Sequence, residues 1–292
     1  MKYIEGLILA VFDPLLLGIR SVIHTFFWRA GRWLYCYARG DLPNRPDTNG
    51  EYWLLGEFVR LSKGSLVLFD VGANKGDWTL QALEIATRRN SRISVYAFEP
   101  CSGTRALLTQ RISSYGGVSI SGNALSSSEG EVCFYSNENG AGTNSLSEIS
   151  GNQRELVKVT TLDLLLSKYG IGAIDMLKVD TEGFDFEVLK GGECALKAGL
   201  IELVQFEYNW RWLINHVALR DVIEFIKDKP YRLGKLMGDA IEIFDEWHFE
   251  MDRYFESNYV LIRSDSRILD IANIVKFDKN NCARRVDGLS NV

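Results

Sequence analysis

Residues 66–76 combine an apolar run, a carboxylate and a glycine turn, and the residues that follow predict a helix. Asp70 ends the run, and Gly72 and Gly76 follow it four positions apart. A strand, a glycine turn and a helix in this order let the backbone approach a cofactor closely, and the first helical turn offers unpaired N–H groups to an anion. A second apolar run ends at Glu99. Two neighbouring parallel strands would therefore each end in a carboxylate, which predicts a cofactor site at that edge.

The charges at this edge favour S-adenosylmethionine as the cofactor. That molecule carries an ammonium and a sulfonium, whose positive charges are compatible with Asp70. The two hydroxyl groups of its ribose could donate hydrogen bonds to the Glu99 carboxylate. A dinucleotide would bring a diphosphate, and normally requires G-x-G-x-x-G with an acidic residue about 20 positions later. Here the middle glycine is missing, and Asp77 would face the diphosphate. A nicotinamide or flavin nucleotide and a purely structural turn remain the alternatives.

A second acidic group follows later strands. Asp180 and Glu182 come directly after the apolar run that begins at residue 174, and Glu207 ends another run. In a doubly wound sheet the carboxyl ends of these strands border the same crevice as the first two. We therefore expect Asp180 and Glu207, together with Glu182, to act as catalytic residues on the methyl acceptor or another substrate. The alternative is that Asp180 and Glu182 only cap the following helix.

Strands and helices alternate along the chain, which predicts an α/β fold with a doubly wound, mostly parallel sheet. The expected strands are 66–71, 94–98, 118–121, 174–179, 201–207 and 257–263. The expected helices are 51–61, 77–89, 102–114, 161–168, 184–197 and 217–228. Residues 131–136 and 156–160 predict a further strand pair around the polar loop 137–152, which could be a lid over the substrate or a plain surface excursion.

Composition excludes several classes of protein. The net charge of −5 over 292 residues argues against a nucleic-acid binder, because no basic stripe would supply affinity for phosphates. Five scattered cysteines without a C-x-x-C pair favour reduced thiols in the cytoplasm over disulfides or a zinc site. Three histidines make a histidine-rich metal centre a poor fit.

Residues 1–40 are rich in aromatic and basic side chains. No uninterrupted apolar run there reaches the roughly 18 residues needed to span a bilayer, and Arg20, Arg29 and Arg32 lie among the aromatic residues. Amphipathic helices of this composition could lie in a membrane interface, which would make the protein membrane-associated. The alternative is that they pack on the protein's own surface or on a second copy in a homo-oligomer.

Four motifs in order carry a resemblance to a known family: Asp-Val-Gly-Ala-Asn-Lys-Gly, Ala-Phe-Glu-Pro, Thr-Leu-Asp and Leu-Lys-Val-Asp-Thr-Glu-Gly. They resemble the FkbM family of S-adenosylmethionine-dependent methyltransferases over about residues 64–210. The resemblance implies a class I, Rossmann-like methyltransferase sheet of seven strands with the last antiparallel. It also implies O-methylation of a hydroxyl group, frequently on a sugar or glycan; N-methylation of a protein or small molecule, or a catalytically silent scaffold, are the alternatives.

The resemblance also implies roles for single residues. Four residues would hold the methionine end of the cofactor: Asp70, Gly72, Asn74 and Gly76. Glu99 would hold the ribose and Asn123 would lie near the adenine, whereas Thr181 stands where the family commonly has a hydrophobic residue. We expect an N-terminal helical extension and linker at 1–50, a methyltransferase domain at 51–265, and a C-terminal helix and polar tail at 266–292.

Methyl transfer mainly requires alignment of the acceptor oxygen, the methyl carbon and the sulfur. No histidine follows a predicted strand, so Asp180 is the leading candidate for taking the proton of the acceptor hydroxyl. A divalent cation bound by Asp180 and Glu207 is an alternative means of activating that hydroxyl.

Overall fold

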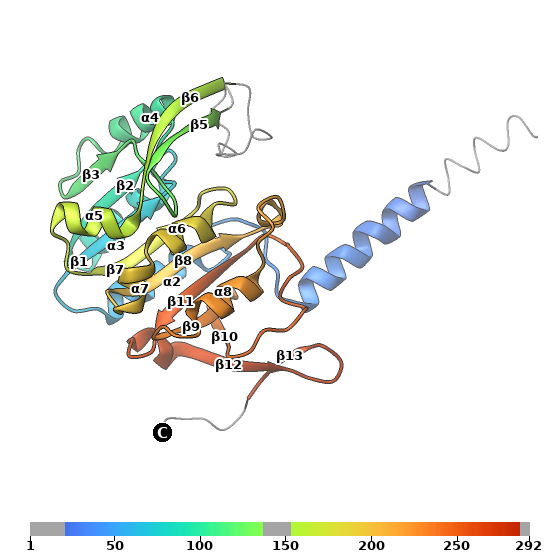
Figure 1. The fold of residues 1–292 in the computed structure, drawn as a ribbon. Coiled ribbons are helices and arrows are strands. Elements are labelled where there is room, and N and C mark those ends of the chain that lie inside the picture. Colours follow the sequence, from blue (N-terminus) through green and yellow to red (C-terminus); the bar gives the residue numbers. More distant parts are fainter. Residues whose placement is uncertain (1–20, 137–152, 287–292) are drawn as a thin grey trace, which may run out of the picture. The chain divides into compact units, whose positions relative to one another are not determined.

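A computed structural model of the chain describes residues 21–136 and 153–286 (Figure 1). The chain divides into two units, Met1–Leu42 and Pro43–Val292. The boundary falls within the linker that the sequence predicts after the N-terminal extension. Residues 43–50 therefore belong to the second unit, which carries the sheet.

In the first unit, a helix covers residues 21–38. This segment carries Arg29 and Arg32 but no acidic side chain. Its large hydrophobic side chains are exposed: Val22, Ile23, Phe26, Phe27, Trp28, Trp33, Leu34, Tyr35 and Tyr37. Within the described ranges, no helix is both long and apolar enough to cross a membrane.

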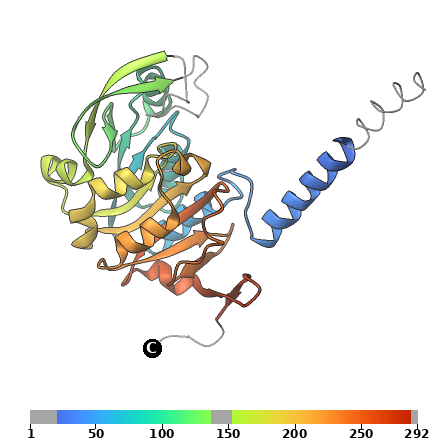
Figure 2. The same cartoon turned by 45° about the vertical axis from the view of Figure 1, so that its right-hand side comes forward.

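The second unit contains a large sheet, a small sheet and helices (Figures 1 and 2). The strands of the large sheet are β1 (Ser65–Val71), β2 (Arg92–Phe98), β3 (Val118–Ser121), β7 (Ile174–Val179), β8 (Ile201–Tyr208), β9 (Tyr231–Leu236), β10 (Ile241–Phe244), β11 (Ser257–Arg263), β12 (Ala272–Phe277) and β13 (Ala283–Arg285). The small sheet consists of β4 (Ala124–Leu125), β5 (Gly130–Ser136) and β6 (Gln153–Thr160). The helices are α2 (Glu51–Leu61), α3 (Asp77–Arg88), α4 (Ser102–Ile112), α5 (Leu162–Tyr169), α6 (Asp185–Gly191), α7 (Glu193–Lys197) and α8 (Leu219–Ile226), with the 3-10 helices η2 (Trp210–Leu213) and η3 (Arg267–Ile271).

The strand order of the large sheet is β13-β12-β10-β9-β11-β8-β7-β1-β2-β3. Strands β3, β2, β1, β7 and β8 are parallel neighbours, and β11 runs antiparallel to both β8 and β9. The fold is therefore α/β with a doubly wound sheet, as predicted. The expected number of seven strands is wrong, because the described part of the sheet has ten strands. Strands β10, β12 and β13 extend it beyond β9.

Three local predictions differ from the structure. Strand β9 was not predicted, because Gly234 and two basic residues interrupt its apolar pattern; a Cβ at Gly234 would lie only 2.8 Å from Ile241 Cγ2 on the neighbouring strand. The single helix expected at 184–197 is divided at Gly192 into α6 and α7. The C-terminal helix expected within 266–292 is the short 3-10 helix η3, followed by β12 and β13 instead of a polar tail.

Residues of the central strands alternate between two apolar layers. Leu68 and Met176 face the layer that contains α2, α3 and η3, whereas Phe69 and Leu177 face the layer that contains α5, α6, α7 and α8. This period of two is what a sheet covered on both faces requires. The expected strand pair also forms, as β5 and β6 in antiparallel register. The loop 137–152 between them lies outside the described residues.

Candidate active site

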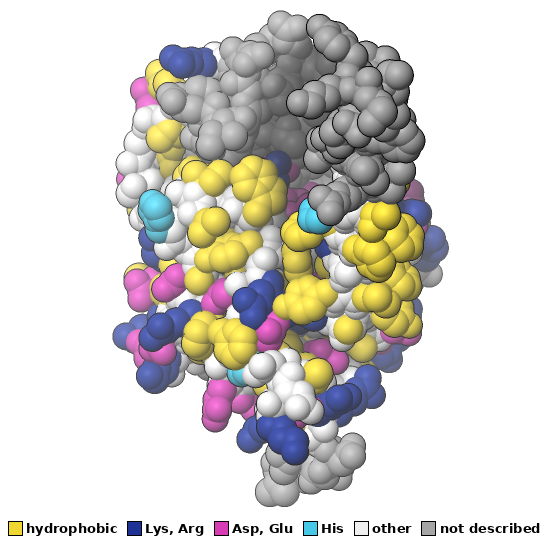
Figure 3. Space-filling view, turned by 90° about the vertical axis from the view of Figure 1, so that its right-hand side faces the viewer, with side chains coloured by type: hydrophobic (Ala, Val, Ile, Leu, Met, Phe, Trp, Pro, Cys, Tyr) yellow, Lys and Arg dark blue, Asp and Glu magenta, His cyan; other side chains and the backbone are white. Residues whose placement is uncertain are grey.

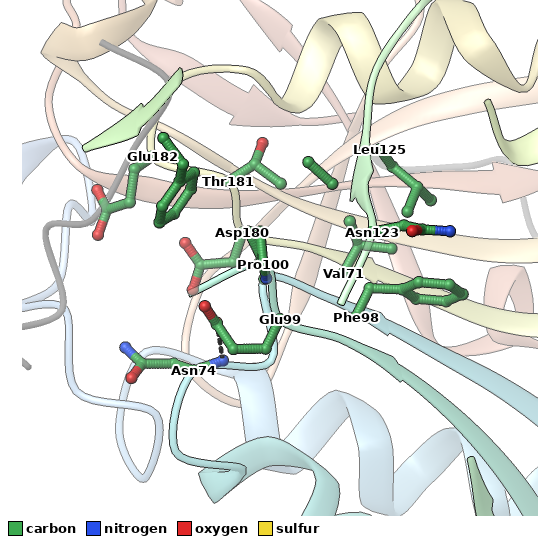
Figure 4. A pocket seen from close by; sticks show the side chains of 13 residues that line it. Val71, Asn74, Phe98, Glu99, Pro100, Asn123, Leu125, Asp180, Thr181 and Glu182 are labelled. Carbon is green, nitrogen blue, oxygen red and sulfur yellow. Dashed lines mark hydrogen bonds between the residues drawn. The ribbon is translucent and has the colours of Figure 1, made fainter. Parts of the chain in front are cut away.

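The carboxyl ends of β1, β2 and β7 border one cavity of about 640 Å³, including space open to solvent (Figure 4). The carboxylates of Glu99, Asp180 and Glu182 lie toward one end of this cavity. Phe98 and Asn123 lie toward the other end. The full lining consists of Val71, Gly72, Asn74, Phe98, Glu99, Pro100, Asn123, Ala124, Leu125, Phe134, Asp180, Thr181 and Glu182.

Most of the residues that the sequence predicts as a site meet at this cavity. Six of them line it: Gly72, Asn74, Glu99, Asn123, Asp180 and Glu182. Three others, Asp70, Gly76 and Glu207, do not line it. The structure thus brings residues of both acidic groups to one cavity.

The Glu99 carboxylate is held at the end of β2 by two backbone groups. Its Oε2 accepts a hydrogen bond from the N–H of Asn74 and its Oε1 from the N–H of Cys101, each at 2.9 Å. Burial raises the pKa of Glu99 to about 7, although these hydrogen bonds act in the opposite direction. Each carboxylate oxygen keeps further acceptor capacity. Glu99 is therefore oriented to accept hydrogen bonds from a ligand in the cavity.

Asp70 supports the turn instead of facing the cavity. It is fully buried, and its Oδ2 accepts a hydrogen bond from the Thr79 hydroxyl of α3 at 2.6 Å. Burial raises the pKa of Asp70, and the nearby Lys178 ammonium partly offsets this. Asp70 therefore joins β1 to the helix that follows the glycine turn.

Both predicted glycines occupy left-handed backbone conformations at close contacts. Gly72 has φ +81°, and a Cβ there would overlap the backbone oxygen of Asp180. Gly76 has φ +85° at the start of α3, and a Cβ there would overlap the Leu108 side chain of α4. Any other residue would be strained at either position.

Lys178 is a site residue that the sequence analysis missed. Its Nζ lies 3.1 Å from Asp180 Oδ2, 3.9 Å from Glu51 Oε2 and 4.0 Å from Asp70 Oδ1. Burial would lower the pKa of Lys178, but the three carboxylates outweigh burial and raise it. A lysine inside the apolar strand that leads to Asp180 was the signal in the sequence, since lysine is almost never buried without a partner.

Glu182 is paired with a cation from η2. The Arg211 guanidinium lies 2.9 Å from the Glu182 carboxylate. Burial and the neighbouring Asp180 raise the pKa of Glu182 to about 8, and Arg211 partly offsets this. The expectation that Glu182 caps the next helix has no support, because the N-cap residue of α6 is Phe184 and makes no side-chain capping bond.

Glu207 is buried near the end of β8 and does not line the cavity. Its Oε1 accepts a hydrogen bond from Asn209 Nδ2 at 2.6 Å, and its Oε2 accepts one from Asn44 Nδ2 at 3.1 Å. Asn44 also donates to Glu256 at 2.9 Å. Burial and the charge of Asp180 raise the pKa of Glu207. Both oxygens of Glu207 are therefore occupied by amide groups of this chain.

The described residues give the divalent-cation alternative no support. They include no group of three or more His, Cys, Asp or Glu side chains that could hold a metal ion. Asp180 is paired with the Lys178 ammonium, and Glu207 is bonded to two amides. A hard cation requires several open oxygen ligands, whereas both oxygens of Glu207 already accept hydrogen bonds and Asp180 already has an ammonium beside it.

Exposed hydrophobic side chains follow Glu207 in the chain. Trp210 and Leu213 of η2 are 51% and 56% exposed. In the space-filling view, hydrophobic side chains reach the surface between charged ones (Figure 3). Since η2 also supplies Arg211 to Glu182, this helix borders the acidic end of the site.

Comparisons with known proteins give a family model, a relative and two solved structures to which this chain is similar. A family model described as Methyltransferase FkbM domain matches residues 70–233. The hexuronic acid methyltransferase AglP of Haloferax volcanii is 31% identical over 200 residues, which cover 66% of this chain and 80% of that protein. A solved FkbM methyltransferase from Methylobacillus flagellatus aligns with a TM-score of 0.43 and 16% identity, over 72% of this chain and 47% of that chain. An S-adenosylmethionine-dependent methyltransferase from Agrobacterium tumefaciens aligns with a TM-score of 0.42 and 8% identity, over 76% and 63% of the two chains.

Proposed function

Because the chain belongs to the FkbM methyltransferase family, we propose that it transfers a methyl group from S-adenosylmethionine to a hydroxyl group of a sugar or glycan. The observation that carries the proposal is the cavity that Glu99 and Asp180 both line, from the ends of β2 and β7 on either side of β1. One carboxylate can serve the cofactor there and the other the acceptor.

The residues around the cavity fit the cofactor. Asn74 Oδ1 is buried and makes no hydrogen bond to the described residues, so it can accept one from a ligand. Glu99 offers carboxylate oxygens to a ribose diol, and Phe98 and Leu125 offer apolar contact near Asn123 for an adenine. When bound, S-adenosylmethionine would supply the methyl group and a good leaving group.

Asp180 would act on the acceptor. As the acceptor oxygen forms its bond to the methyl carbon, its proton would pass to the Asp180 carboxylate. The side chain of Asp180 is 34% exposed and lines the cavity, so a hydroxyl group can reach it. Lys178 and Glu182 border it on either side.

The charges of the site favour a hydroxyl over a carboxylate as acceptor. A hexuronic acid, the substrate named for the relative from Haloferax volcanii, carries both groups. The acidic end of this site presents Asp180 and Glu182, and the nearby cations Lys178 and Arg211 are paired with them. A second carboxylate placed there would be repelled, whereas a neutral hydroxyl would not.

Methyl-labelled S-adenosylmethionine tests the proposal. The protein is incubated with hexuronic acids, with neutral sugars and glycans, and with a protein fraction, and each product is then treated with mild alkali. We expect the label on a sugar and stable to alkali, because methyl ethers survive alkali and methyl esters do not. Label that alkali removes would assign the carboxylate as acceptor, and label in protein amines would contradict O-methylation.

A further inference from the structure

We infer that Lys178 is the positioning residue that keeps the Asp180 side chain ionised and turned toward the acceptor. This inference rests on the proposed role of Asp180 in methyl transfer. Lys178 is 6% exposed and stands on β7 two positions before Asp180, so both side chains project from the same face of the strand. Lys178 Nζ therefore reaches Asp180 Oδ2, at 3.1 Å, without a turn of the backbone between the two residues.

Lys178 is the cation that lies nearest to Asp180 in a group of acidic side chains. The carboxylates that face Lys178 come from α2, β1 and the end of β7: Glu51, Asp70 and Asp180. The further carboxylates whose charges act with that of Asp180 are Glu182, Asp185 and Glu207. Arg211 from η2 is paired with Glu182, and Arg105 from α4 donates to Glu99 O and Pro100 O. Removing the lysine would take away the cation nearest to Asp180, and a proton would bind Asp180 more readily.

Glu51 holds the other side of Lys178. It begins α2, is 6% exposed, and its N–H donates to Asn49 Oδ1 at 3.0 Å. Its position lies outside the family match at 70–233. The segment before the matched domain therefore contributes directly to the charge balance behind Asp180.

Replacement of Lys178 tests the inference by two independent readouts. Carbon-13 NMR of aspartate-labelled protein follows the Asp180 carboxylate, whose resonance is identified by its loss in Asp180→Asn. In Lys178→Met we expect its titration midpoint to rise by at least about one pH unit, as loss of an adjacent opposite charge requires. The acid limb of the pH–kcat/KM profile should move in the same direction, while affinity for S-adenosylhomocysteine changes little.

Two further variants serve as controls. Lys178→Arg keeps the positive charge, so its titration midpoint should stay close to that of wild type. Lys229→Met removes another buried lysine, which lies in the loop before β9 at the opposite end of the sheet and bonds Phe225 O and Asp228. It should leave the Asp180 midpoint unchanged. If Lys178→Met does not fold, the double variant with Glu51→Gln removes one buried charge of each sign and should still show the rise.

An Asp180 midpoint that does not move in a folded variant without Lys178 would overturn the inference. So would a rise of the same size in Lys178→Arg. Failure of the proposed function would look different: wild-type protein would methylate no hydroxyl acceptor, while the NMR titration would still report on the ion pair.

Discussion

Gly72 and Asp180 touch through their backbones where the ends of β1 and β7 meet. The side of Gly72 Cα where any other residue would carry its Cβ faces the Asp180 carbonyl, and the N–H of Asp180 donates to Val71 O at 2.9 Å. The loop that would hold the cofactor and the residue that would serve the acceptor are therefore fixed relative to each other by main-chain contacts. A shift in one must move the other.

Substitution of Gly72 tests this contact. Gly72→Ala should destabilise the fold by at least about 2 kcal/mol, because the new Cβ requires both a left-handed backbone and a separation of the two strand ends. Gly64→Ala is a matched control, since Gly64 has φ +86° and nothing within 4 Å of a built Cβ. It should cost only about 1 kcal/mol, the penalty of the backbone conformation. Urea unfolding measures the free energy of unfolding of both variants. Equal losses of stability would contradict a steric contribution from the contact between Gly72 and Asp180.

Cofactor affinity should depend on pH through Glu99. The pKa of Glu99 is raised from 4.5 to about 7 in the folded protein without ligand. Between these pH values the folded protein binds a proton that the unfolded chain has released, and the stability that this proton contributes is lost as pH rises through about 7. The ribose diol would donate to the ionised form. S-adenosylhomocysteine should therefore bind roughly tenfold more weakly at pH 6 than at pH 8. Calorimetry at both values checks this, and Glu99→Gln should bind weakly at both; an unchanged pH dependence in that variant would rule out Glu99 as the source.

Asp180 should be required for turnover and dispensable for cofactor binding. Asp180→Asn should lower kcat by roughly 10²-fold or more, the size of a lost general base. Affinity for S-adenosylhomocysteine should stay within about threefold, because Glu99 and Asn74 are untouched. Asp175→Asn on the same strand is the control, since Asp175 bonds Val67 N–H at the other end of β7. Loss of cofactor affinity with surviving turnover would reverse the assignment.

The helix at residues 21–38 should bind anionic membrane surfaces. Its exposed aromatic side chains stand beside Arg29 and Arg32 with no acidic residue between them, which is the composition of an interfacial helix. We expect sedimentation with phosphatidylglycerol vesicles that weakens as salt rises, and less binding by the double variant Phe27→Ser and Trp28→Ser. Absence of vesicle binding together with a concentration-dependent oligomer would instead favour packing against a second copy.

Sequence reasoning located the cavity because its strands end in carboxylates. The apolar runs before Asp70, Glu99 and Asp180 set the strand ends, and the topology of a parallel sheet brings such ends to one edge. What the pattern could not show is which of these side chains face the cavity. Asp70 and Glu207 have the same chemistry as Asp180, but the local hydrogen bonds of Thr79 and of two amides turn them away.

The missed elements have a common physical cause. Gly234 interrupts the apolar pattern of β9, so that strand was not predicted. The strand that contains Lys178 was predicted, but its pattern gave no sign of the carboxylates that pair with this lysine. In the structure both are explained by a distant partner: carboxylates of other elements neutralise Lys178, and Ile241 on β10 leaves no room for a side chain at Gly234. Contacts of this kind come from the tertiary fold and leave no mark on local periodicity.

The packing of α2 against η3 has a consequence for synthesis of the chain. Leu54 and Ile268 belong to one apolar layer, and Arg267 donates to Leu61 O at 3.0 Å across a separation of 206 residues. A chain that leaves the ribosome from its N-terminus cannot complete this layer until nearly the whole sequence has emerged. Part of the apolar side of α2 therefore stays uncovered until then, and a release delayed before residue 267 would leave an aggregation-prone nascent chain.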